Sequence, residues 1–483
     1  MTPEALIAIA LVVPVGAAAL VAASFRAPNL REAITLCAAG ALFVTVASLL
    51  PSVLSGERPS LGVVEIFPGL ALGFRVEPFG LLFALIASGL WILSSLYSIG
   101  YMRGNAESHQ TRFYVCFALA IASTIGVAFS GNLLSLFLFY EMLTLVTYPL
   151  VTHHGDDEAR RGGRTYLGVL LFTSTALLLP AIVATWIFAG TLEFVPGGVL
   201  EGKLSPFGAT LLLALLMFGI GKAAIMPFHR WLPAAMVAPT PVSALLHAVA
   251  VVKAGVFAVV KVIVYTFGFD AAGANFAWLP YVAGFTIIAA SIVALRADNL
   301  KRRLAYSTVS QLSYVVLAAA VLAPISVVGA ALHIVAHAFG KITLFFAAGA
   351  IYTASRKTRV SELDGIGRRM PWTLAAFAVA SLSMIGLPPT AGVISKWYMV
   401  TGAVQAQHWA ALAVIAASTL LNAGYFIPIV YRAFLREPPT LDQAHGEAPW
   451  TMVVALVATA ALTILLFFFA DVPISLARGL LGG

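Results

Sequence analysis

Lysine residues occur deep inside stretches of this sequence that are otherwise apolar, and no arginine does. An ionisable group at the depth of a membrane costs several kcal/mol, so it usually faces an interior path or a partner. Arginine stays protonated, whereas a buried lysine can lose its proton near neutral pH, as loading and releasing protons requires. Lys261 lies late in its stretch, so we expect it to reach the membrane interface by snorkelling. The five residues are Lys222, Lys253, Lys261, Lys341 and Lys396.

Glu141 is the only one of the 20 acidic residues expected inside an apolar stretch, SLFLFYEMLTLVTYPL. A lone carboxylate there needs a cation or a proton, and Lys222 is the partner we expect. Moving a charge near such a pair would change the proton affinity of the lysine. A static structural ion pair is the alternative interpretation. Tyr140, Thr144 and Ser310 are neutral polar residues expected near water paths.

Three titratable residues share one face of an expected helix. His333, His337 and Lys341 follow one another at intervals of four residues in HIVAHAFGK, which places them on one side of a helix. Titratable groups one turn apart can pass protons through bridging water, and His247 in SALLHA could continue such a path. The alternative is that the histidines pack between helices and bond to Ser, Thr or carbonyl groups. A metal site is not expected, because the spacing alone is a weak signal.

Two of the apolar stretches are interrupted beside a deep lysine. The run MPFHRWLPAAMVAPTP follows Lys222, and GLPPTAG precedes Lys396. Breaks in a membrane helix are tolerated only beside protein or a wet cavity. Corresponding breaks in two halves of a chain point to inverted repeats and their ion sites. The prolines concerned are Pro227 and Pro239 in the first run and Pro388 and Pro389 in the second.

Composition excludes a soluble globular domain. The chain is 61% hydrophobic and 10% charged, with a mean hydropathy of +0.97. Such a chain is expected to be an all-α polytopic membrane protein with about 14 transmembrane helices. The net charge of +8 is explained by basic loops on the cytoplasmic side, without nucleic acid. Cys37 and Cys116 lie in apolar runs and suit neither a disulfide framework nor a metal site.

The expected spans divide a single transmembrane domain, residues 1–483, into four parts. Three spans lie within 1–111, and the last lies at 449–470. Between them we expect two inverted repeats of about five spans each, at 112–266 and 277–431. The seventh and twelfth spans, near 207–238 and 371–402, are the broken ones.

The segments between the spans give further expectations. Most of the 28 Lys and Arg residues fall in odd-numbered loops, which places these loops in the cytoplasm and both termini outside. Residues Gly56–Glu77 alternate weakly and predict a small hairpin outside the bilayer. His153 and His154, beside the run GDDE, are interpreted as solvated loop residues.

Several of these runs resemble one family. PFHRWLPAAMVAPTPVSALLHAVAVVKAGVF resembles the signature of the antiporter-like, proton-translocating membrane subunits, and LFYEMLTL, HIVAHAFGKITLFF and GLPPTAGVISKWY support it. The family includes components of respiratory complex I, of multisubunit Na+/H+ antiporters (their A-type and D-type components) and of membrane-bound hydrogenases. The resemblance implies a glutamate at the interface between subunits, lysines on spans seven, eight and twelve, and a polar axis between them. The matching residues are Glu141, Lys222, Lys253, Lys396, His247, His333 and His337.

The function implied is proton translocation through buried Glu, Lys and His residues, coupled to redox chemistry or cation movement in partner subunits. The alternative is a D-type component of a multisubunit Na+/H+ antiporter without redox activity. A structural component with a dead channel and a stand-alone organic-solute transporter are further alternatives. The chain carries no motif for iron–sulfur, nucleotide or haem binding, so whether it serves an oxidoreductase is left open. Expected partners are other membrane subunits, including further antiporter-like ones, in a prokaryotic cytoplasmic membrane, with protons alone or also Na+ as cargo.

Overall fold

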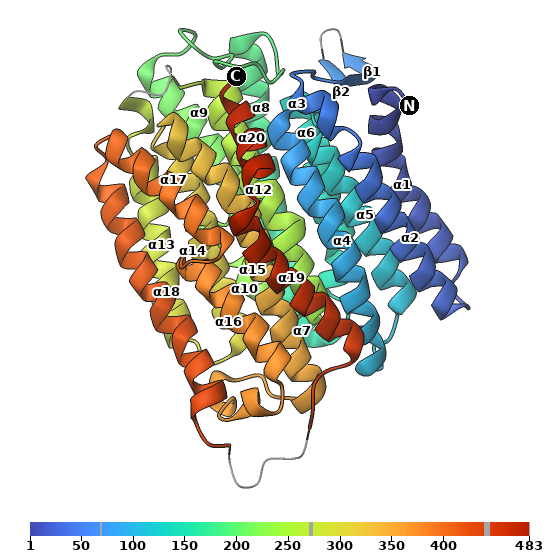
Figure 1. Ribbon diagram of the computed structural model, residues 1–483. Helices are drawn as coiled ribbons and strands as arrows, with labels where there is room; N and C mark the ends of the chain where they lie inside the picture. Colours follow the sequence, from blue (N-terminus) through green and yellow to red (C-terminus); the bar gives the residue numbers. More distant parts are fainter. Residues whose placement is uncertain (68–69, 270–273, 439–444, 483) are drawn as a thin grey trace.

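The computed structural model describes residues 1–67, 70–269, 274–438 and 445–482, and it is a bundle of long helices (Figure 1). Most helices run along one common direction, as expected for an all-α membrane protein. In the described part of the chain, eleven helical segments are long and apolar enough to cross a membrane. The polytopic fold is therefore confirmed, while the count of fourteen spans and the inverted repeats stay predictions.

The N-terminal part contains the expected hairpin. Strand β1 (Ser60–Phe67) pairs antiparallel with β2 (Leu70–Arg75), with Ser60 opposite Arg75. The hairpin lies at the same end of the bundle as both chain termini (Figure 1). The helices of this part are α1 (Pro3–Ala23), α2 (Pro28–Ala47), α3 (Leu50–Leu54) and α4 (Pro78–Gly104).

Helices continue to the C-terminus, and two of them stop early at the predicted breaks. The first half contains α5 (Gln110–Ala128), α6 (Leu133–Val151), α7 (Asp157–Thr173), α8 (Leu179–Ala189), α9 (Pro206–Gly219), α10 (Trp231–Ala234), α11 (Thr240–Ala244) and α12 (Val251–Lys261). The second half contains α13 (Leu279–Arg296), α14 (Leu300–Ala320), α15 (Pro324–Ser355), α16 (Pro371–Ile385), α17 (Ala391–Gln405), α18 (Trp409–Leu435), α19 (Trp450–Phe468) and α20 (Asp471–Arg478).

The second interruption coincides with the predicted run GLPPTAG, whereas the first begins before Lys222 and the proline-rich run that follows it. Helix α9 ends at Gly219 and is followed by a short 3-10 turn, Gly221–Ala223, before the chain leaves helical geometry. Helix α16 ends before Gly386, whose φ of +91° is favourable for glycine. A third irregularity was not predicted. Within the first predicted repeat, 112–266, π-helical turns at Leu245–Val249 and Val262–Phe267 flank α12.

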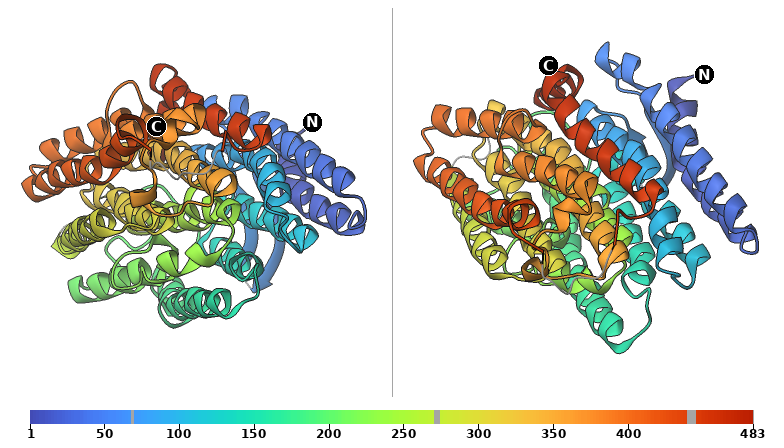
Figure 2. Two further views of the ribbon diagram at one scale, coloured as in Figure 1. Left: turned by 90° about the horizontal axis from the view of Figure 1, so that it is seen from below. Right: turned by 60° about the horizontal axis from the view of Figure 1, so that its bottom comes forward.

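Two elements form the centre of the bundle. The segment Thr240–Phe267 is wholly enclosed, and α15 is nearly so, whereas α1 and α2 lie along one side (Figure 2). Since α12 carries Lys253 and α15 carries the two central histidines, protein encloses these residues on all sides.

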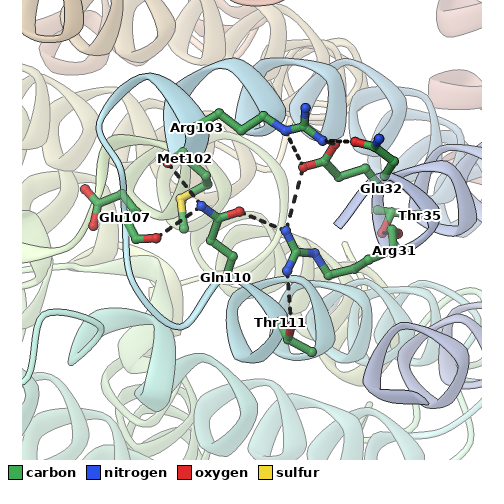
Figure 3. A network of polar contacts seen from close by, with 9 residues as sticks. Arg31, Glu32, Thr35, Met102, Arg103, Glu107, Gln110 and Thr111 are labelled. Atoms are coloured by element: carbon green, nitrogen blue, oxygen red, sulfur yellow. Dashed lines mark hydrogen bonds and ion pairs between the residues drawn. The ribbon is translucent and has the colours of Figure 1, made fainter. Parts of the chain in front are cut away.

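A polar network joins the peripheral helices to the bundle (Figure 3). Arg103 Nε donates to Glu32 Oε1 at 3.0 Å, and Arg31 donates to Gln110 Oε1 at 2.8 Å and Thr111 Oγ1 at 3.1 Å. Glu32 is buried within α2, so the expectation that Glu141 is the only acid inside a span is wrong. The reason is that α2 already begins at Pro28, so Glu32 lies within the helix, where Arg103 neutralises its carboxylate.

Candidate functional site

The first break holds Lys222 against α6. Its Nζ donates to the carbonyl of Tyr140 at 2.7 Å and to Thr144 Oγ1 at 2.6 Å, and it lies 3.2 Å from the centroid of the Tyr140 ring. Its backbone N–H donates to the Tyr140 hydroxyl at 3.0 Å. The lysine is fully buried. Neutral oxygens and an aromatic face therefore surround this ammonium group.

Glu141 lies beside that lysine pocket, and its charge acts on Lys222. It follows Tyr140, so its side chain leaves α6 about 100° further round the helix. Leu138 and Leu145 on the same side are 41% and 57% exposed, which marks this as the lateral surface. Among the described residues, no hydrogen-bond partner meets the buried Glu141 Oε1. Direct pairing of Glu141 with Lys222 is not seen in this arrangement and stays a prediction.

Lys253 and His337 meet at the centre of the bundle. The lysine Nζ is in direct hydrogen-bond contact with His337 Nδ1, and both side chains are buried. One turn along α15, the His333 ring centroid lies 6.1 Å from that of His337. The shared face predicted for these histidines thus places both in a row with the lysine of α12.

His333 connects this row to α14 and α17. Its Nε2 lies 2.9 Å from Gln311 Oε1, and its Nδ1 lies 3.0 Å from Ser395 Oγ. Lys396 is the next residue after Ser395. The chain of contacts from Lys253 therefore reaches the residue that precedes the lysine of the second break.

Lys396 occupies the second break in the way that Lys222 occupies the first. Its Nζ donates to the carbonyl of Ile385, the last residue of α16, at 2.7 Å and to Thr419 Oγ1 at 3.1 Å. Each break lysine thus binds one backbone carbonyl and one threonine hydroxyl. Neutral oxygens therefore hold this ammonium group too.

Two predicted path residues, Lys341 and His247, lie beside the row and make other contacts. Lys341 donates to Ser307 Oγ at 2.7 Å and to the Leu304 carbonyl at 3.2 Å. His247 packs on Phe345, with ring centroids 4.7 Å apart. Neither ring nitrogen of His247 has a hydrogen-bond partner among the described residues, although the ring is fully buried.

The expected snorkelling of Lys261 is wrong. Its Nζ lies 2.9 Å from Glu77 Oε2 and donates to the Ser130 carbonyl at 3.0 Å, and the side chain is only 1% exposed. Glu77 immediately precedes α4, below the hairpin. The partner lies 184 positions away in the sequence, which is why the sequence did not reveal it.

A cavity of about 370 Å³ opens at the end of the bundle away from the hairpin. Glu107, His154 and Asp156 line it together with Pro239 at the start of α11 and Lys301. Lys301 Nζ donates to the Ala238 carbonyl at 2.6 Å. The cavity therefore reaches from acidic loops to the segment that follows the first break.

The paired loop histidines differ in environment. His154 Nε2 lies 3.4 Å from Glu107 Oε2, and this hydrogen bond raises the pKa of His154. The expectation that His153 is solvated is wrong, because it is 1% exposed and burial lowers its pKa to about 4. Its ring packs on Phe113, with centroids 6.2 Å apart, so α5 covers it.

Sequence reasoning missed Gln311, Ser395 and Glu77. The run STVSQLS, unusually polar for a span, was the available signal for Gln311. Among the described residues, no group of three or more His, Cys, Asp or Glu side chains could hold a metal ion. Lysines, histidines and neutral polar groups form the row at the centre of the bundle.

Comparison with known proteins assigns the family. Residues 130–422 match the family described as NADH:quinone oxidoreductase/Mrp antiporter, TM. This chain belongs to that family. The matched part contains the residues from Glu141 to Lys396 that form both breaks and the central row.

Relatives of this family member belong to several kinds of complex. It is 32% identical to the N-type component of NADH-quinone oxidoreductase from Desulforudis audaxviator, over 87% of this chain and 85% of the relative. It is 26% identical to the D-type component of the Na(+)/H(+) antiporter from Alkalihalophilus pseudofirmus, over 83% of each. It is 32% identical to the A/B-type component of a probable K(+)/H(+) antiporter from Rhizobium meliloti, but spans only 41% of that protein.

Solved structures share the fold of this antiporter-like protein. A chain of the Mrp complex from Dietzia sp. DQ12-45-1b matches with a TM-score of 0.89 at 21% identity, covering 100% of this chain and 97% of that one. A chain of the membrane-bound sulfane sulfur reductase, an archaeal respiratory membrane complex, matches with a TM-score of 0.87 at 20% identity, covering 98% and 97%. Both structures are multisubunit membrane complexes.

Proposed function

We propose that this chain translocates protons as one antiporter-like subunit of a multisubunit complex in a prokaryotic cytoplasmic membrane. The observation that carries the proposal is the buried row in which Lys253 contacts His337 and His333 contacts Ser395. Its partners are other membrane subunits, including further antiporter-like ones. Redox chemistry or cation movement in those partners supplies the energy, because this chain has no redox motif.

The two break lysines are the sites where charge is stored. A lysine held by neutral oxygens can release its proton without leaving an unpaired carboxylate behind, which would be costly inside a membrane. Lys222 and Lys396 both have neutral oxygens as hydrogen-bond partners, and Glu141 acts on Lys222 from beside its pocket. Protons pass between them through Lys253, His337 and His333, with water bridging the steps that lack a direct contact.

Glu141 provides the control point. It lies on the side of α6 where Leu138 and Leu145 are exposed, next in sequence to the residue whose carbonyl and ring hold Lys222. A cation brought to Glu141 by a partner protein, or closure of Glu141 onto Lys222, would alter the field at the lysine. This coupling links events outside the chain to proton release within it.

The orientation we propose places the cavity beside Glu107 and His154 in the cytoplasm and both termini outside. The basic odd-numbered loops support this arrangement. Protons are then taken up beside Glu107 and His154 and pass along the segment after the first break. His247 and Lys341 line the interior of that region and complete the path.

A second candidate function is an Na+/H+ antiporter component without redox activity. The similarity to the D-type antiporter component over 83% of both chains favours it. The two functions differ in the driving force and in whether sodium moves. Both require the same buried lysines.

Transport in inverted vesicles that contain the whole native complex tests the proposal. Proton and sodium movement are measured for wild type, Lys222→Ala and Glu141→Gln, driven in turn by NADH, reduced ferredoxin or a preset proton gradient. Lys203→Ala is the matched control, since that lysine is exposed and donates to the Ala189 carbonyl. Loss of transport in both test variants, with the complex assembled, supports the coupled path, and the effective driving force separates the two functions. Unchanged transport in both variants leaves a scaffolding role.

A further inference from the structure

Gln311, His333 and Ser395 form a cluster where α14, α15 and α17 meet the second break. All three side chains are fully buried. Each nitrogen of the His333 ring has one partner, Gln311 at Nε2 and Ser395 at Nδ1. The protonation of this ring is therefore decided by what its two neighbours can donate and accept.

Gln311 is held in one orientation. Its Nε2 donates to the carbonyl of Met384 at 3.3 Å, and Asn422 Nδ2 donates to the same carbonyl at 3.3 Å. A carbonyl oxygen can only accept, so the amide nitrogen of Gln311 faces Met384 and its Oε1 faces His333. Because Oε1 can only accept as well, Nε2 of His333 must carry a hydrogen.

Ser395 has two alternative acceptors. Its hydroxyl lies 3.0 Å from His333 Nδ1 and 3.0 Å from the Gly392 carbonyl. When His333 is neutral, the hydroxyl donates to Nδ1. When His333 is charged, Nδ1–H donates to Oγ and the hydroxyl turns to Gly392. Both states keep every buried donor paired, and only the hydroxyl rotates.

We propose that Gln311 and Ser395 make His333 a step of the proton path that both receives and releases its proton at Nδ1, next to Ser395. Gln311 blocks Nε2, so protons do not pass through the ring from one nitrogen to the other. Ser395 accommodates the proton that Nδ1 gains or gives up. Gln311 and Ser395 are positioning residues, and this assignment rests on the proposed function and deepens it.

Other titratable groups surround this ring. His337 lies one turn away on α15, with Lys253 in contact with it, and Lys396 follows Ser395 on α17. The Tyr314 ring of α14 lies 5.6 Å from His333, measured between centroids. The variants below leave all of these groups unchanged, so a difference in pH dependence reports on Gln311 and Ser395.

Transport by the whole complex in vesicles, measured from pH 5.5 to 9, tests the assignment. Ser395→Ala removes the hydroxyl and is expected to lower transport at least tenfold, whereas Ser395→Thr keeps a hydroxyl and is expected to stay within about twofold of wild type. Gln311→Glu keeps the shape but places a carboxylate opposite Nε2–H. A charge so close moves a titration by about 1–3 pH units, so the pH dependence is expected to shift to more alkaline pH by about one unit or more. Ser313→Ala is the control, because that buried hydroxyl of α14 donates within its own helix.

The outcomes separate this assignment from the proposed function. If Lys222→Ala abolishes transport while Ser395→Ala transports normally and Gln311→Glu keeps the wild-type pH dependence, the assignment is overturned and the proposed function stands. If Lys222→Ala also transports normally, the proposed function fails first. If the Ser395→Ala complex fails to assemble, the nearly isosteric Gln311→Glu variant tests the assignment alone. An unchanged pH dependence of transport in that variant overturns the assignment.

Discussion

The buried ion pair between Lys261 and Glu77 allows a quantitative test of the fold. The two side chains are 1% and 7% exposed, and Nζ and Oε2 are 2.9 Å apart. Removing one partner leaves the other charge buried without compensation, which costs about 3–5 kcal/mol, whereas replacing both is often nearly neutral. We therefore expect Lys261→Met to destabilise the protein by about 3–5 kcal/mol, and Lys261→Met combined with Glu77→Gln to cost much less.

Reversible unfolding of this chain in detergent measures both values. A loss of about 3 kcal/mol lowers the folding equilibrium constant by about 150-fold. The control is Glu193→Gln, which removes the partner of Arg75 from a pair that is 36% and 44% exposed. That change should cost less than about 1 kcal/mol, because exposed pairs are screened. A Lys261→Met protein as stable as wild type, or a double variant as unstable as the single one, would refute the reasoning.

Three further predictions concern the break and the loops. A Cβ at Gly255 would lie 2.3 Å from the carbonyl carbon of Lys222, so Gly255→Ala should displace the break and lower vesicle transport at least tenfold. Nothing lies within 4 Å of a Cβ at Gly16, so Gly16→Ala should leave transport unchanged. Equal transport by the Gly255→Ala and Gly16→Ala variants would contradict this packing. Thr144→Val removes an oxygen that accepts from Lys222 and should lower transport about tenfold, a net loss of about 1.4 kcal/mol, while Thr144→Ser should retain it. Because the pKa of His154 is raised, its contact with Glu107 stabilises the folded state fully below a pH of about 6.5. This stabilisation is lost as the pH rises through the raised pKa. Hydrogen exchange of the loop between α6 and α7 should therefore increase with pH more steeply than the intrinsic exchange rate. Glu107→Gln should remove this additional increase. An additional increase of the same size in the Glu107→Gln variant would count against the contact.

The elements and their breaks were predictable because their causes are local. Apolar length predicts a span, and proline with glycine predicts its interruption, so the end of α16 followed from the sequence, whereas α9 ends before the proline-rich run. The weak alternation of residues 56–77 sufficed for the hairpin. The π-helical turns around α12 were not predictable, because no residue type in LLHAV or VIVYTF requires them.

Contacts across the bundle were less predictable, because a sequence gives the face of a helix and not its neighbour. The spacing of His333 and His337 indicated one shared face, but nothing in it selected Lys253 as the partner of His337. Lys261 illustrates the same limit. Its position late in a span suggested the interface, whereas packing buried it against Glu77.

The most direct test of the central claim is proton transport by the assembled complex in vesicles with His337→Gln. Glutamine retains polar groups and approximate size but does not titrate, so the contact with Lys253 remains while proton transfer through residue 337 stops. The account predicts that transport falls at least tenfold, with assembly and hydrogen-bonded packing preserved. Transport at the wild-type rate in assembled His337→Gln complexes would contradict a proton path through the row of Lys253, His337 and His333.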